Sequence, residues 1–350
     1  RGATEAKLQQ QTTTSTITTK QPNQQRNNRM SSSQKTPFAK DCLEGRVALV
    51  TGGGSGIGFE IARQLLRHGC SGVVICGRRA AFLQRACQLL QQQQQQQQQN
   101  DQYRPVQSSS FSAGRASYHV CDVRQPSECQ AAVAHCFQEF GRLDVLVNGA
   151  AGNFLAAAEQ LSPKGFATVL AIDTLGTYNM CHAAYAALKQ RQQNTNNKQT
   201  AIIINISATL QCPATHWQAH ASAAKAGVDS LTRSLALEWG PDRIRVVGIA
   251  PGPIANTPGT TKLAPGLTAD DQNDMVSEGI PLGRMGEAWE IGHAAVYLCT
   301  AEYVTGDVLI VDGGQWLYKP PLVPRDMVAQ LSRKVEAKSR AQAPLRQSKL

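Results

Sequence analysis

The stretch from Arg46 to Gly69 constrains the fold more than any other part of this 350-residue chain. It opens with Val47–Val50, a short apolar run typical of a strand buried on both faces. A turn crowded with glycine follows, at Gly52, Gly53, Gly54, Gly56 and Gly58. Apolar residues then recur at helical spacing until Gly69 supplies a stop: Ile57, Ile61, Leu65 and Leu66. The stretch therefore predicts a strand, a tight turn and a helix in direct succession.

A turn of this kind binds anions, because unpaired backbone N–H groups converge there and the helix dipole favours negative charge. The missing side chains also let a pyrophosphate approach the backbone closely. The alternative is a glycine-rich surface loop, and the flanking strand and helix argue against it. We predict a dinucleotide site formed by Gly52, Gly54, Ser55, Gly56, Ile57 and Gly58.

The second predicted strand, Val73–Cys76, ends in Gly77-Arg78-Arg79. In dinucleotide folds an acidic residue at this point selects NAD by binding the 2′-hydroxyl of the adenosine ribose. Here glycine stands at the expected acidic position, and a guanidinium suits a 2′-phosphate. Arg78 is therefore predicted to favour NADPH. The alternative is that both arginines simply begin a solvated helix.

Strands and helices alternate through the rest of the chain. Helices are expected over residues 127–140, 164–188 and 216–239, and further strands at Ser117–Cys121, Leu143–Val147, Ala201–Ile206, Ile244–Ile249 and Val308–Val311. This alternation predicts an α/β fold, a Rossmann-type doubly wound parallel sheet of about seven strands in a single domain. Ligands bind beyond the carboxyl ends of such strands, where the noted polar and small-residue motifs fall.

Low-complexity segments flank and interrupt the predicted domain, which spans residues 43–318. Residues 1–40 are rich in Thr, Gln, Asn and Ser and are expected to form a disordered tail. The glutamine run lies in a low-complexity insertion over residues 91–115, and a second polar insertion covers 190–199. Residues 319–350 are expected to form a C-terminal tail. Because the sequence begins with Arg1, an N-terminal presequence could precede it.

The net charge of +10 comes from residues near the two ends of the chain. Residues 1–46 and 325–350 together hold 15 of the 35 basic and 5 of the 25 acidic residues, so 20 of each remain between them. This balance predicts no nucleic-acid partner. No apolar run reaches the length of about 18 residues that a membrane span needs. The ten cysteines are scattered without a CxxC pair, which favours reduced, buried thiols, and no metal site is predicted.

Three motifs together resemble the short-chain dehydrogenase/reductase family, over about Leu43 to Leu317. They are the turn from Thr51 to Gly58, the Asn148-Gly149-Ala150 turn, and Pro251-Gly252 after the sixth predicted strand. The resemblance implies that Asp122 contacts the adenine and that the cofactor site also includes Asn148, Lys225, Pro251, Gly252 and Ile254.

The family usually carries an active-site Ser and a Tyr-x-x-x-Lys pair. Lys225 matches the Lys, but Ala221 stands at the Tyr position and Ala208 at the Ser position. Ordinary alcohol and ketone chemistry needs an ionisable phenol to exchange a proton with the substrate oxygen. The sequence therefore argues against a plain alcohol dehydrogenase.

Within that family the chain is similar to peroxisomal 2,4-dienoyl-CoA reductases, which also lack this Tyr and Ser. The similarity lies in Ala150–Leu155, Ile172–Thr174, His220-Ala221 with Lys225, and Ala250–Ile254. It implies NADPH-dependent reduction of a 2,4-dienoyl-CoA to a 3-enoyl-CoA, a step in the β-oxidation of unsaturated fatty acids. Hydride would add at the far end of the diene, and negative charge would move to the thioester oxygen.

The resemblance also implies residue roles. Asn153 would donate to the thioester carbonyl, with a loop-stapling Asn as the alternative. Asp173 would hold the water that protonates the α carbon, with a structural ion pair to Lys225 as the alternative. Lys225 would bind the nicotinamide ribose and favour anionic intermediates. The implied substrate contacts are Arg124, Phe154, Ser162 and Lys262. His220 is expected to be a satisfied core histidine and is left out of the catalytic set.

Ser348-Lys349-Leu350 match the C-terminal peroxisomal address, which predicts a peroxisomal location and an import receptor as a partner. The resemblance further implies a homo-oligomer, a tetramer or a dimer, formed through the helices that carry Asp173 and Lys225. Two other functions stay open: another peroxisomal acyl-CoA reductase of the same family, and a non-catalytic NADP(H)-binding scaffold.

Overall fold

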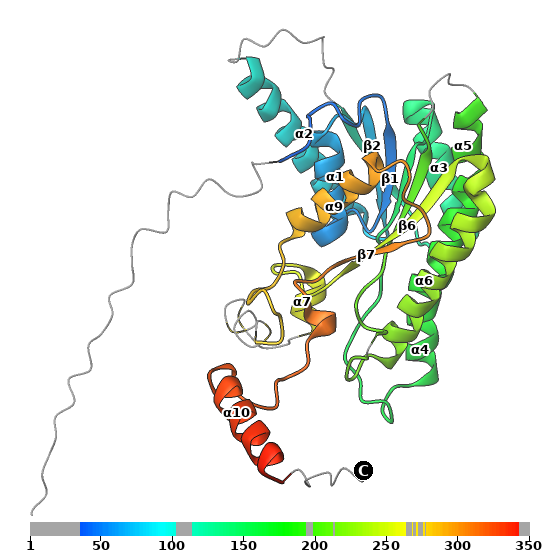
Figure 1. Cartoon of the computed structure of the whole chain (residues 1–350). Coiled ribbons are helices and arrows are strands. Elements are labelled where there is room, and N and C mark those ends of the chain that lie inside the picture. Colours follow the sequence, from blue (N-terminus) through cyan, green and yellow to red (C-terminus); the bar gives the residue numbers. More distant parts are fainter. Residues whose placement is uncertain are drawn as a thin grey trace, which may run out of the picture. The chain divides into compact units, whose positions relative to one another are not determined.

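Seven parallel strands form one sheet in the order β3-β2-β1-β4-β5-β6-β7 (Figure 1). The computed structural model describes residues 36–102, 114–193, 199–212, 214–263, 268, 271, 276 and 278–342, and Phe38–Leu350 is one compact unit. The strands are β1 (Val47–Thr51), β2 (Gly72–Gly77), β3 (Arg115–Val120), β4 (Val145–Asn148), β5 (Ala201–Ile206), β6 (Ile244–Pro251) and β7 (Val308–Val311). The predicted doubly wound α/β sheet is confirmed.

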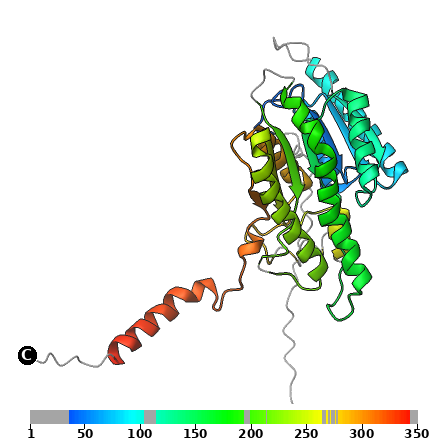
Figure 2. The same ribbon diagram turned by 90° about the vertical axis from the view of Figure 1, so that its right-hand side faces the viewer.

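Helices cover both faces of the sheet (Figures 1 and 2). One apolar cluster joins the sheet to α1 (Gly56–Arg67), α2 (Ala80–Gln102) and α9 (Ala288–Thr300). A second cluster joins the opposite face to α3 (Pro126–Phe140), α5 (Gly176–Gln193) and α6 (Ala219–Trp239). Every residue of β1, β4 and β6 is buried, as the continuous apolar runs of these strands predict.

The helix expected over residues 164–188 is interrupted around Asp173. It consists of α4 (Pro163–Leu170), a π-helical turn labelled η2 (Ala171–Leu175), and α5. A π turn inserts one extra residue into a helix and redirects the side chains around it. Asp173 lies at the centre of η2, and its side chain points inward and is 1 % exposed.

The glutamine run, predicted to lie in a low-complexity insertion between a helix and a strand, is part of a helix. Helix α2 continues through it to Gln102, the Nε2 of Gln91 donates to the carbonyl oxygen of Ala116 at 3.0 Å, and Gln94 is buried. Glutamine is a good helix former, and extending a helix that already exists is far easier than nucleating one. Part of the insertion, residues 103–113, lies outside the described residues, as do residues 194–198 of the second polar insertion.

Both predicted tails contain ordered segments. Phe38, assigned to the N-terminal tail, packs its ring against His68 and His293 at centroid distances of 5.8 and 5.9 Å. The C-terminal tail contains helix α10 (Arg325–Gln342), on which apolar and charged residues alternate with helical spacing. The rest of the N-terminal tail and Ser348-Lys349-Leu350 lie outside the described residues.

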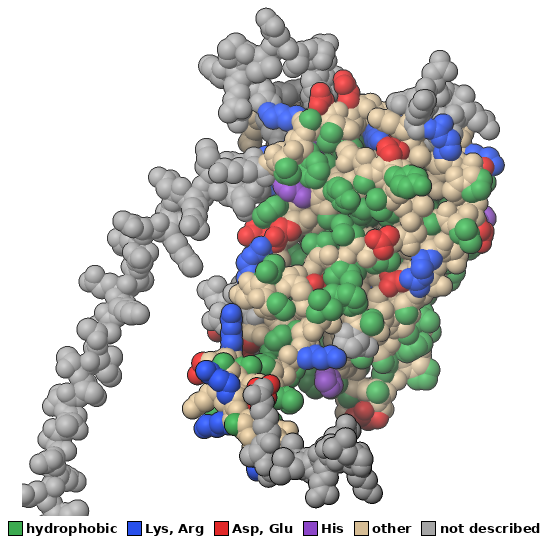
Figure 3. Space-filling model, viewed as in Figure 1, with side chains coloured by type: hydrophobic (Ala, Val, Ile, Leu, Met, Phe, Trp, Pro, Cys, Tyr) green, Lys and Arg blue, Asp and Glu red, His purple; other side chains and the backbone are tan. Residues whose placement is uncertain are grey.

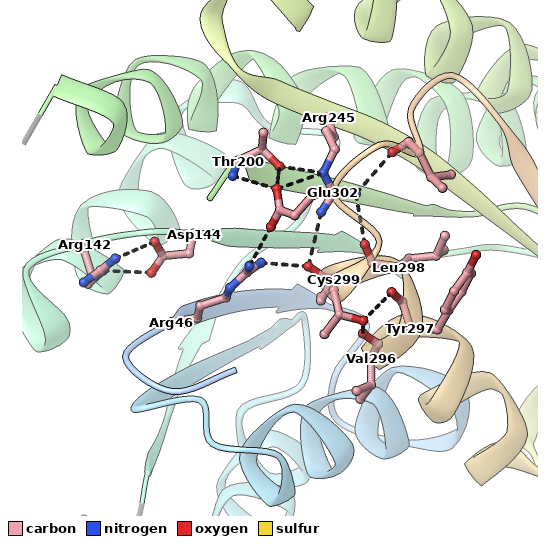
Figure 4. Close-up of polar contacts among 12 residues, drawn as sticks. Arg46, Arg142, Asp144, Thr200, Arg245, Val296, Tyr297, Leu298, Cys299 and Glu302 are labelled. Carbon is pink, nitrogen blue, oxygen red and sulfur yellow. Dashed lines mark hydrogen bonds and ion pairs between the residues drawn. The ribbon is translucent and has the colours of Figure 1, made fainter. Parts of the chain in front are cut away.

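The amino ends of the strands are closed by two buried arginines (Figure 4). Arg46 donates to the carbonyl oxygen of Cys299 at 3.0 Å and to Oε1 of Glu302 at 2.9 Å. Arg245 donates to the carbonyl oxygens of Leu298 and Cys299 at 2.9 and 3.2 Å. These carbonyls end α9, where the helix dipole favours positive charge. Side-chain contacts therefore occupy the amino ends of the strands. A ligand is expected at the carboxyl ends of the strands instead.

On the face shown in Figure 3, Lys and Arg side chains are scattered among Asp and Glu. Eight of the ten cysteines are buried, and all ten are free thiols, as the sequence predicts. In the part of the chain that the structure describes, no helix is both long and apolar enough to cross a bilayer.

Candidate functional site

The carboxyl ends of the strands bring the predicted motifs to one edge of the sheet. Thr51 pairs with Asn148 across β1 and β4, and Asn148 pairs with Asn205 across β4 and β5. Pro251, the last residue of β6, pairs with Val311 of β7. The glycine turn, the Asn148–Asn153 loop and the Pro251–Thr257 loop therefore begin side by side.

The glycine turn is built so that side chains are excluded from it. Gly52 has a φ of +68°, and a Cβ there would lie 2.5 Å from the carbonyl oxygen of Gly149. A Cβ on Gly58 would lie 2.5 Å from the carbonyl oxygen of Gly52. The first turn of α1 carries no acidic residue, and the N-cap Ser55 makes no side-chain capping bond. These features suit an anionic group on the backbone N–H groups.

Thr51 belongs to the motif noted in the sequence but was not among the predicted cofactor residues. Its Oγ1 accepts from the backbone N–H groups of Gly149 and Ala150 at 3.1 and 3.2 Å. This hydroxyl ties the end of β1 to the loop after β4. Its position directly before Gly52 is the sequence feature that could have indicated this role.

Asn148 faces the interior. Its Nδ2 donates to Oδ1 of Asn205 at 2.8 Å and contacts Sγ of Cys181 at 3.2 Å, and Asn205 in turn donates to Oγ1 of Thr232 at 2.9 Å. This polar chain braces the ends of β4 and β5 against α6. The Nδ2 of Asn148 is thus engaged in a structural brace, whereas its Oδ1 is buried without a hydrogen-bond partner among the described residues.

Arg78, Asp122 and Arg124 gather at the ends of β2 and β3. The guanidinium of Arg124 hydrogen-bonds both carboxylate oxygens of Asp122, with Nε at 2.9 and 3.0 Å. These bonds lower the pKa of Asp122, and the charge of Arg78 lowers it further. Arg79 instead lies over the ring of Phe82, 3.9 Å from its centroid. Arg124, predicted to contact the substrate, therefore lies beside Asp122, which is predicted to contact the adenine.

The Pro251–Thr257 loop is held by its own contacts. A Cβ on Gly252 would lie 2.6 Å from Cβ of Asp312. Ile254 is buried and forms a parallel bridge with Gly286. The hydroxyl of Thr257 donates to the carbonyl oxygen of Ile254 at 3.0 Å. Lys262 follows on α7 (Pro258–Leu263) and is exposed.

Asp173 and Lys225 form a buried ion pair. Oδ2 of Asp173 lies 3.0 Å from Nζ of Lys225, and Oδ1 accepts from the backbone N–H of Gly152 at 2.7 Å. Lys225 also donates to the carbonyl oxygen of Ile206, at the end of β5, at 2.8 Å. The two side chains are 1 % and 9 % exposed. The pairing that the sequence left open as an alternative is therefore present, beside the carboxyl end of β5.

Small residues on α6 bring this pair together. A Cβ on Gly227 would lie 2.8 Å from Cγ2 of Thr174, and Oγ1 of Thr174 donates to the carbonyl oxygen of Ala224 at 2.9 Å. The small face of α6 was expected to allow some close approach, and the partner is the π turn. Ala221 packs with Ala224 and Val169 in a small apolar cluster. Position 221, where the family usually has a tyrosine, is therefore surrounded by apolar side chains.

The loop after β4 is joined to the start of α6. Nδ2 of Asn153 donates to Oε1 of Gln218 at 2.6 Å, and the backbone N–H of Ala156 donates to the carbonyl oxygen of Trp217 at 2.9 Å. The rings of Phe154 and His220 lie 4.3 Å apart, tilted by 31°. Asn153 thus links two loops rather than stapling its own turn, and Gln218 is a residue that the sequence analysis missed.

The predicted substrate residues do not all meet. Phe154 is 38 % exposed, and its ring lies within contact distance of a Cβ placed on Gly165, which is also close to Oγ of Ser162. Ser162 caps α4, since its Oγ accepts from the backbone N–H of Gly165 at 3.1 Å. Phe154 and Ser162 therefore lie together, while Arg124 lies with Asp122 and Lys262 lies on α7.

Comparison with known proteins agrees with this architecture. A family model described as enoyl-(acyl carrier protein) reductase matches residues 80–315. A peroxisomal 2,4-dienoyl-CoA reductase of Arabidopsis thaliana is 48 % identical over 310 residues, which cover 87 % of this chain and 96 % of that protein. The peroxisomal 2,4-dienoyl-CoA reductase of Rattus norvegicus is 40 % identical over 285 residues, 81 % of this chain and 88 % of that protein.

Among solved structures, a 3-ketoacyl-(acyl-carrier-protein) reductase from Brucella melitensis, complexed with NADH, matches with a TM-score of 0.65 at 29 % identity. The match covers 78 % of this chain and 99 % of that one. A short chain dehydrogenase from Bacillus anthracis matches with a TM-score of 0.65 at 32 % identity, covering 80 % of this chain and all of that one. The chain therefore belongs to the short-chain dehydrogenase/reductase family, and it is similar to the peroxisomal 2,4-dienoyl-CoA reductases of that family.

Proposed function

We propose that this protein reduces 2,4-dienoyl-CoA thioesters to 3-enoyl-CoA with NADPH. One observation carries the proposal: Ala221 fills the phenol position inside an apolar cluster, while a buried Asp173–Lys225 pair lies at the carboxyl end of β5. A site without a phenol suits a reaction in which no proton goes to a carbonyl oxygen. Reduction of a conjugated thioester is such a reaction, because the negatively charged intermediate is protonated on a carbon atom. The similarity to dienoyl-CoA reductases supports the same substrate.

The residues at the edge of the sheet fit a dinucleotide. A Cβ at Gly52 would collide with the carbonyl oxygen of Gly149, and one at Gly58 with that of Gly52, so the turn stays free of side chains at both positions. Bare backbone of this kind lets a pyrophosphate approach closely. Arg78 would bind the 2′-phosphate, Asp122 the adenosine, and Lys225 the nicotinamide ribose. When bound, NADPH supplies the hydride. The selection of NADPH over NADH rests on the exposed Arg78, which follows β2 at the tip where an acidic residue would select NAD.

Asn153 is proposed to stabilise the anion that develops on the thioester oxygen. Its Nδ2 carries two hydrogens, and the bond to Gln218 uses one of them. The bond to Gln218 also fixes the amide plane. A donor held in advance toward developing charge is worth about 2.7–4 kcal/mol of barrier.

Asp173 and Lys225 are proposed to act on the same anion. The ammonium of Lys225 is buried, so its charge is screened little by water. Asp173 holds that ammonium at 3.0 Å and can accept a further bond from water with a remaining lone pair. The pair thus orients one cation and one water-binding carboxylate toward the acyl chain.

The decisive experiment mixes the purified protein with NADPH and a short 2,4-dienoyl-CoA. We expect the dienoyl absorbance and the NADPH absorbance to fall together, with no turnover of a saturated acyl-CoA. Equal or faster turnover of a 2-enoyl-CoA would identify a different acyl-CoA reductase. NADPH binding without oxidation by any acyl-CoA in the panel would identify a non-catalytic scaffold.

We also propose a peroxisomal location, supported by the similarity to reductases named peroxisomal. A fluorescent protein ending in residues 340–350 of this chain is expected to collect in peroxisomes through the import receptor. The same fusion carrying the substitution Lys349→Ser is the control, and equal import of both would contradict the proposed address.

A homo-oligomer is proposed as well, because apolar side chains are exposed on the α5–α6 layer. Leu175 and Tyr178 are 50 % and 43 % exposed, and Leu237 on α6 is 81 % exposed. Their burial against a second copy would stabilise a dimer or tetramer. The mass of the full chain in solution tests this directly.

A further inference from the structure

Trp217 adopts a backbone conformation that large side chains rarely take. Its φ is +60°, in the left-handed region, where the Cβ atom crowds the following carbonyl oxygen. Among the described residues, Arg243 and Asn256 are the other two that share this conformation without being glycine, both with a φ of +57°. Asparagine enters the region more readily, whereas a bulky side chain there is a genuine outlier. The fold therefore holds a strained tryptophan where glycine would fit without strain.

Hydrogen bonds to the loop after β4 hold this strained conformation. The carbonyl oxygen of Trp217 accepts from the backbone N–H of Ala156 at 2.9 Å. Oε1 of the next residue, Gln218, accepts from Nδ2 of Asn153 at 2.6 Å. Backbone strain persists where surrounding bonds fix the chain in this way. These bonds explain the conformation of the backbone, but they involve no atom of the indole ring.

The indole ring contributes little burial to the fold. Trp217 is 61 % exposed, although tryptophan is highly buried on average. The ring lies near that of the preceding residue, His216, with the centroids 5.7 Å apart. An exposed ring on a strained backbone is not explained by folding stability. Residues strained in this way cluster at active sites and ligand clamps, so the ring points to a bound molecule.

Further apolar side chains are exposed on the loop that Trp217 binds. Phe154 and Leu155 are 38 % and 36 % exposed. They stand directly between Asn153 and Ala156, the two loop residues that are bonded to the segment at the start of α6. We call Phe154, Leu155 and Trp217 the apolar rim. It lies next to Asn153, the proposed contact of the thioester carbonyl.

We propose that the indole of Trp217 packs on the acyl chain of the substrate and makes Trp217 a residue that determines chain-length preference. This role rests on the proposed function. The acyl chain extends from the thioester that Asn153 would hold, and the apolar rim begins at the next residue, Phe154. A hydrocarbon chain suits the rim, because its three side chains offer carbon surface and no charge.

Chain length separates this occupant from two others. The nucleotide of coenzyme A could stack on the ring, and a second copy of the chain could bury it. Neither contact depends on the length of the acyl chain. A contact with hydrocarbon grows with the chain, by about fourfold in affinity for each methylene that is fully buried.

The test measures kcat and KM of the full-length protein with NADPH and a short, a medium and a long 2,4-dienoyl-CoA. For W217G we expect KM to rise by about tenfold or more for the long substrate, with little change for the short one and an unchanged kcat. W217F keeps an aromatic ring and should keep most of the preference for long chains.

R243G is the matched control for the backbone. Arg243 has nearly the same φ as Trp217 and lies directly before β6, at the amino ends of the strands. Glycine relieves the left-handed strain at both positions, but only W217G removes a side chain of the apolar rim. We expect R243G to leave KM unchanged for every chain length.

The outcomes separate the two proposals. A wild type that reduces no dienoyl-CoA refutes the proposed function and the role of Trp217 with it. An active wild type whose W217G variant keeps the same dependence of KM on chain length refutes only the role of Trp217. An equal loss at every chain length also refutes it, because the ring would then contact coenzyme A or a second copy. If W217G does not fold, a crystal structure of the wild type with a long-chain acyl-CoA decides: the chain is expected on the indole, and a chain that runs elsewhere overturns the proposal.

Discussion

Asp173 shows how one residue gains its properties from its neighbours. Its carboxylate is 1 % exposed, and it is bonded to the backbone N–H of Gly152 and to Nζ of Lys225. Removal of one partner from a buried pair leaves the other charge uncompensated. The stability and the chemistry of the site therefore depend on the same two side chains.

The variant D173A is expected to lose at least about 99 % of turnover, because the water-binding carboxylate is gone and the ammonium of Lys225 is unpaired. A stability loss of about 3 kcal/mol accompanies it, the usual cost of breaking a buried pair. Steady-state kinetics and denaturant unfolding measure the two effects. The exposed pair Lys189–Asp242, with a similar separation of 2.9 Å, provides the control D242N. Normal turnover in D173A would refute the assigned role.

Arg78 and Arg79 are adjacent but differ in what they contact. Arg79 lies over the ring of Phe82, whereas Arg78 acts on Asp122 at the proposed adenosine site. We expect R78A to weaken NADPH binding by about tenfold or more, the worth of a charge-assisted bond, with little change for NADH. R79A is the matched variant and should have the smaller effect. Binding titrations with both nucleotides check this, and equal losses for NADPH and NADH in R78A would contradict it.

Among the elements, the glycine turn is specified by close packing against the loop after β4. Two glycines in the structure share nearly the same backbone angle: Gly52 has a φ of +68° and Gly141 one of +71°. They differ in their surroundings, because a Cβ on Gly52 meets the carbonyl oxygen of Gly149 at 2.5 Å and one on Gly141 meets nothing within 4 Å.

The pair G52A and G141A therefore separates backbone strain from collision. G141A should cost about 1–2 kcal/mol from the left-handed conformation alone and leave NADPH binding unchanged. G52A should cost more and reduce NADPH affinity by about tenfold or more, because the turn must move away from Gly149. Thermal unfolding and NADPH titration measure both. Intact NADPH binding in G52A would show that the cofactor does not lie on this turn.

At the scale of the whole molecule, the two ends of the sheet have different roles. The amino ends of the strands hold structural ion pairs, and the carboxyl ends hold the proposed active site. At the amino end, Glu302 bonds Arg46 and Thr200 and lies 3.8 Å from Arg245 (Figure 4). Burial acts to raise the pKa of Glu302, but the bonds from Thr200 and Arg46 and the charge of Arg245 outweigh it, so the pKa is lowered.

E302Q is expected to lower the free energy of unfolding by about 2 kcal/mol at pH 7, because two buried guanidinium groups lose their counter-charge. A lowered pKa gives stability that is present above the ordinary Glu pKa of about 4.3 and lost as the pH falls through the folded value. The difference between wild type and E302Q should therefore shrink below about pH 4. Glu139, with the same 38 % exposure but a 3.9 Å pair to an exposed Arg115, gives the control E139Q. Denaturant unfolding at several pH values measures this, and equal effects of E139Q and E302Q would contradict it.

Much of this architecture follows from local sequence. The apolar runs of β1, β5 and β7 and the glycines after β1 identify the sheet, because buried parallel strands and phosphate turns each need one kind of residue at fixed spacing. The glutamine run was misread because composition alone does not show that a helix already formed by Ala80–Leu90 continues. Phe38 was assigned to the disordered tail because its packing partner, His68, is distant in the sequence and local composition does not reveal the contact.

The sequence by itself determined the sheet, the dinucleotide turn and the absence of a phenol at position 221, since each depends on residue type at a known spacing. Only the tertiary structure decided how the polar groups are shared. It paired Asp173 with Lys225 and Arg124 with Asp122, and it joined Asn153 to Gln218. The physical reason is that a hydrogen bond or an ion pair depends on distances of a few tenths of an ångström between segments far apart in the chain. Those distances are set by the packing of α6 against the π turn and by the register of the strands.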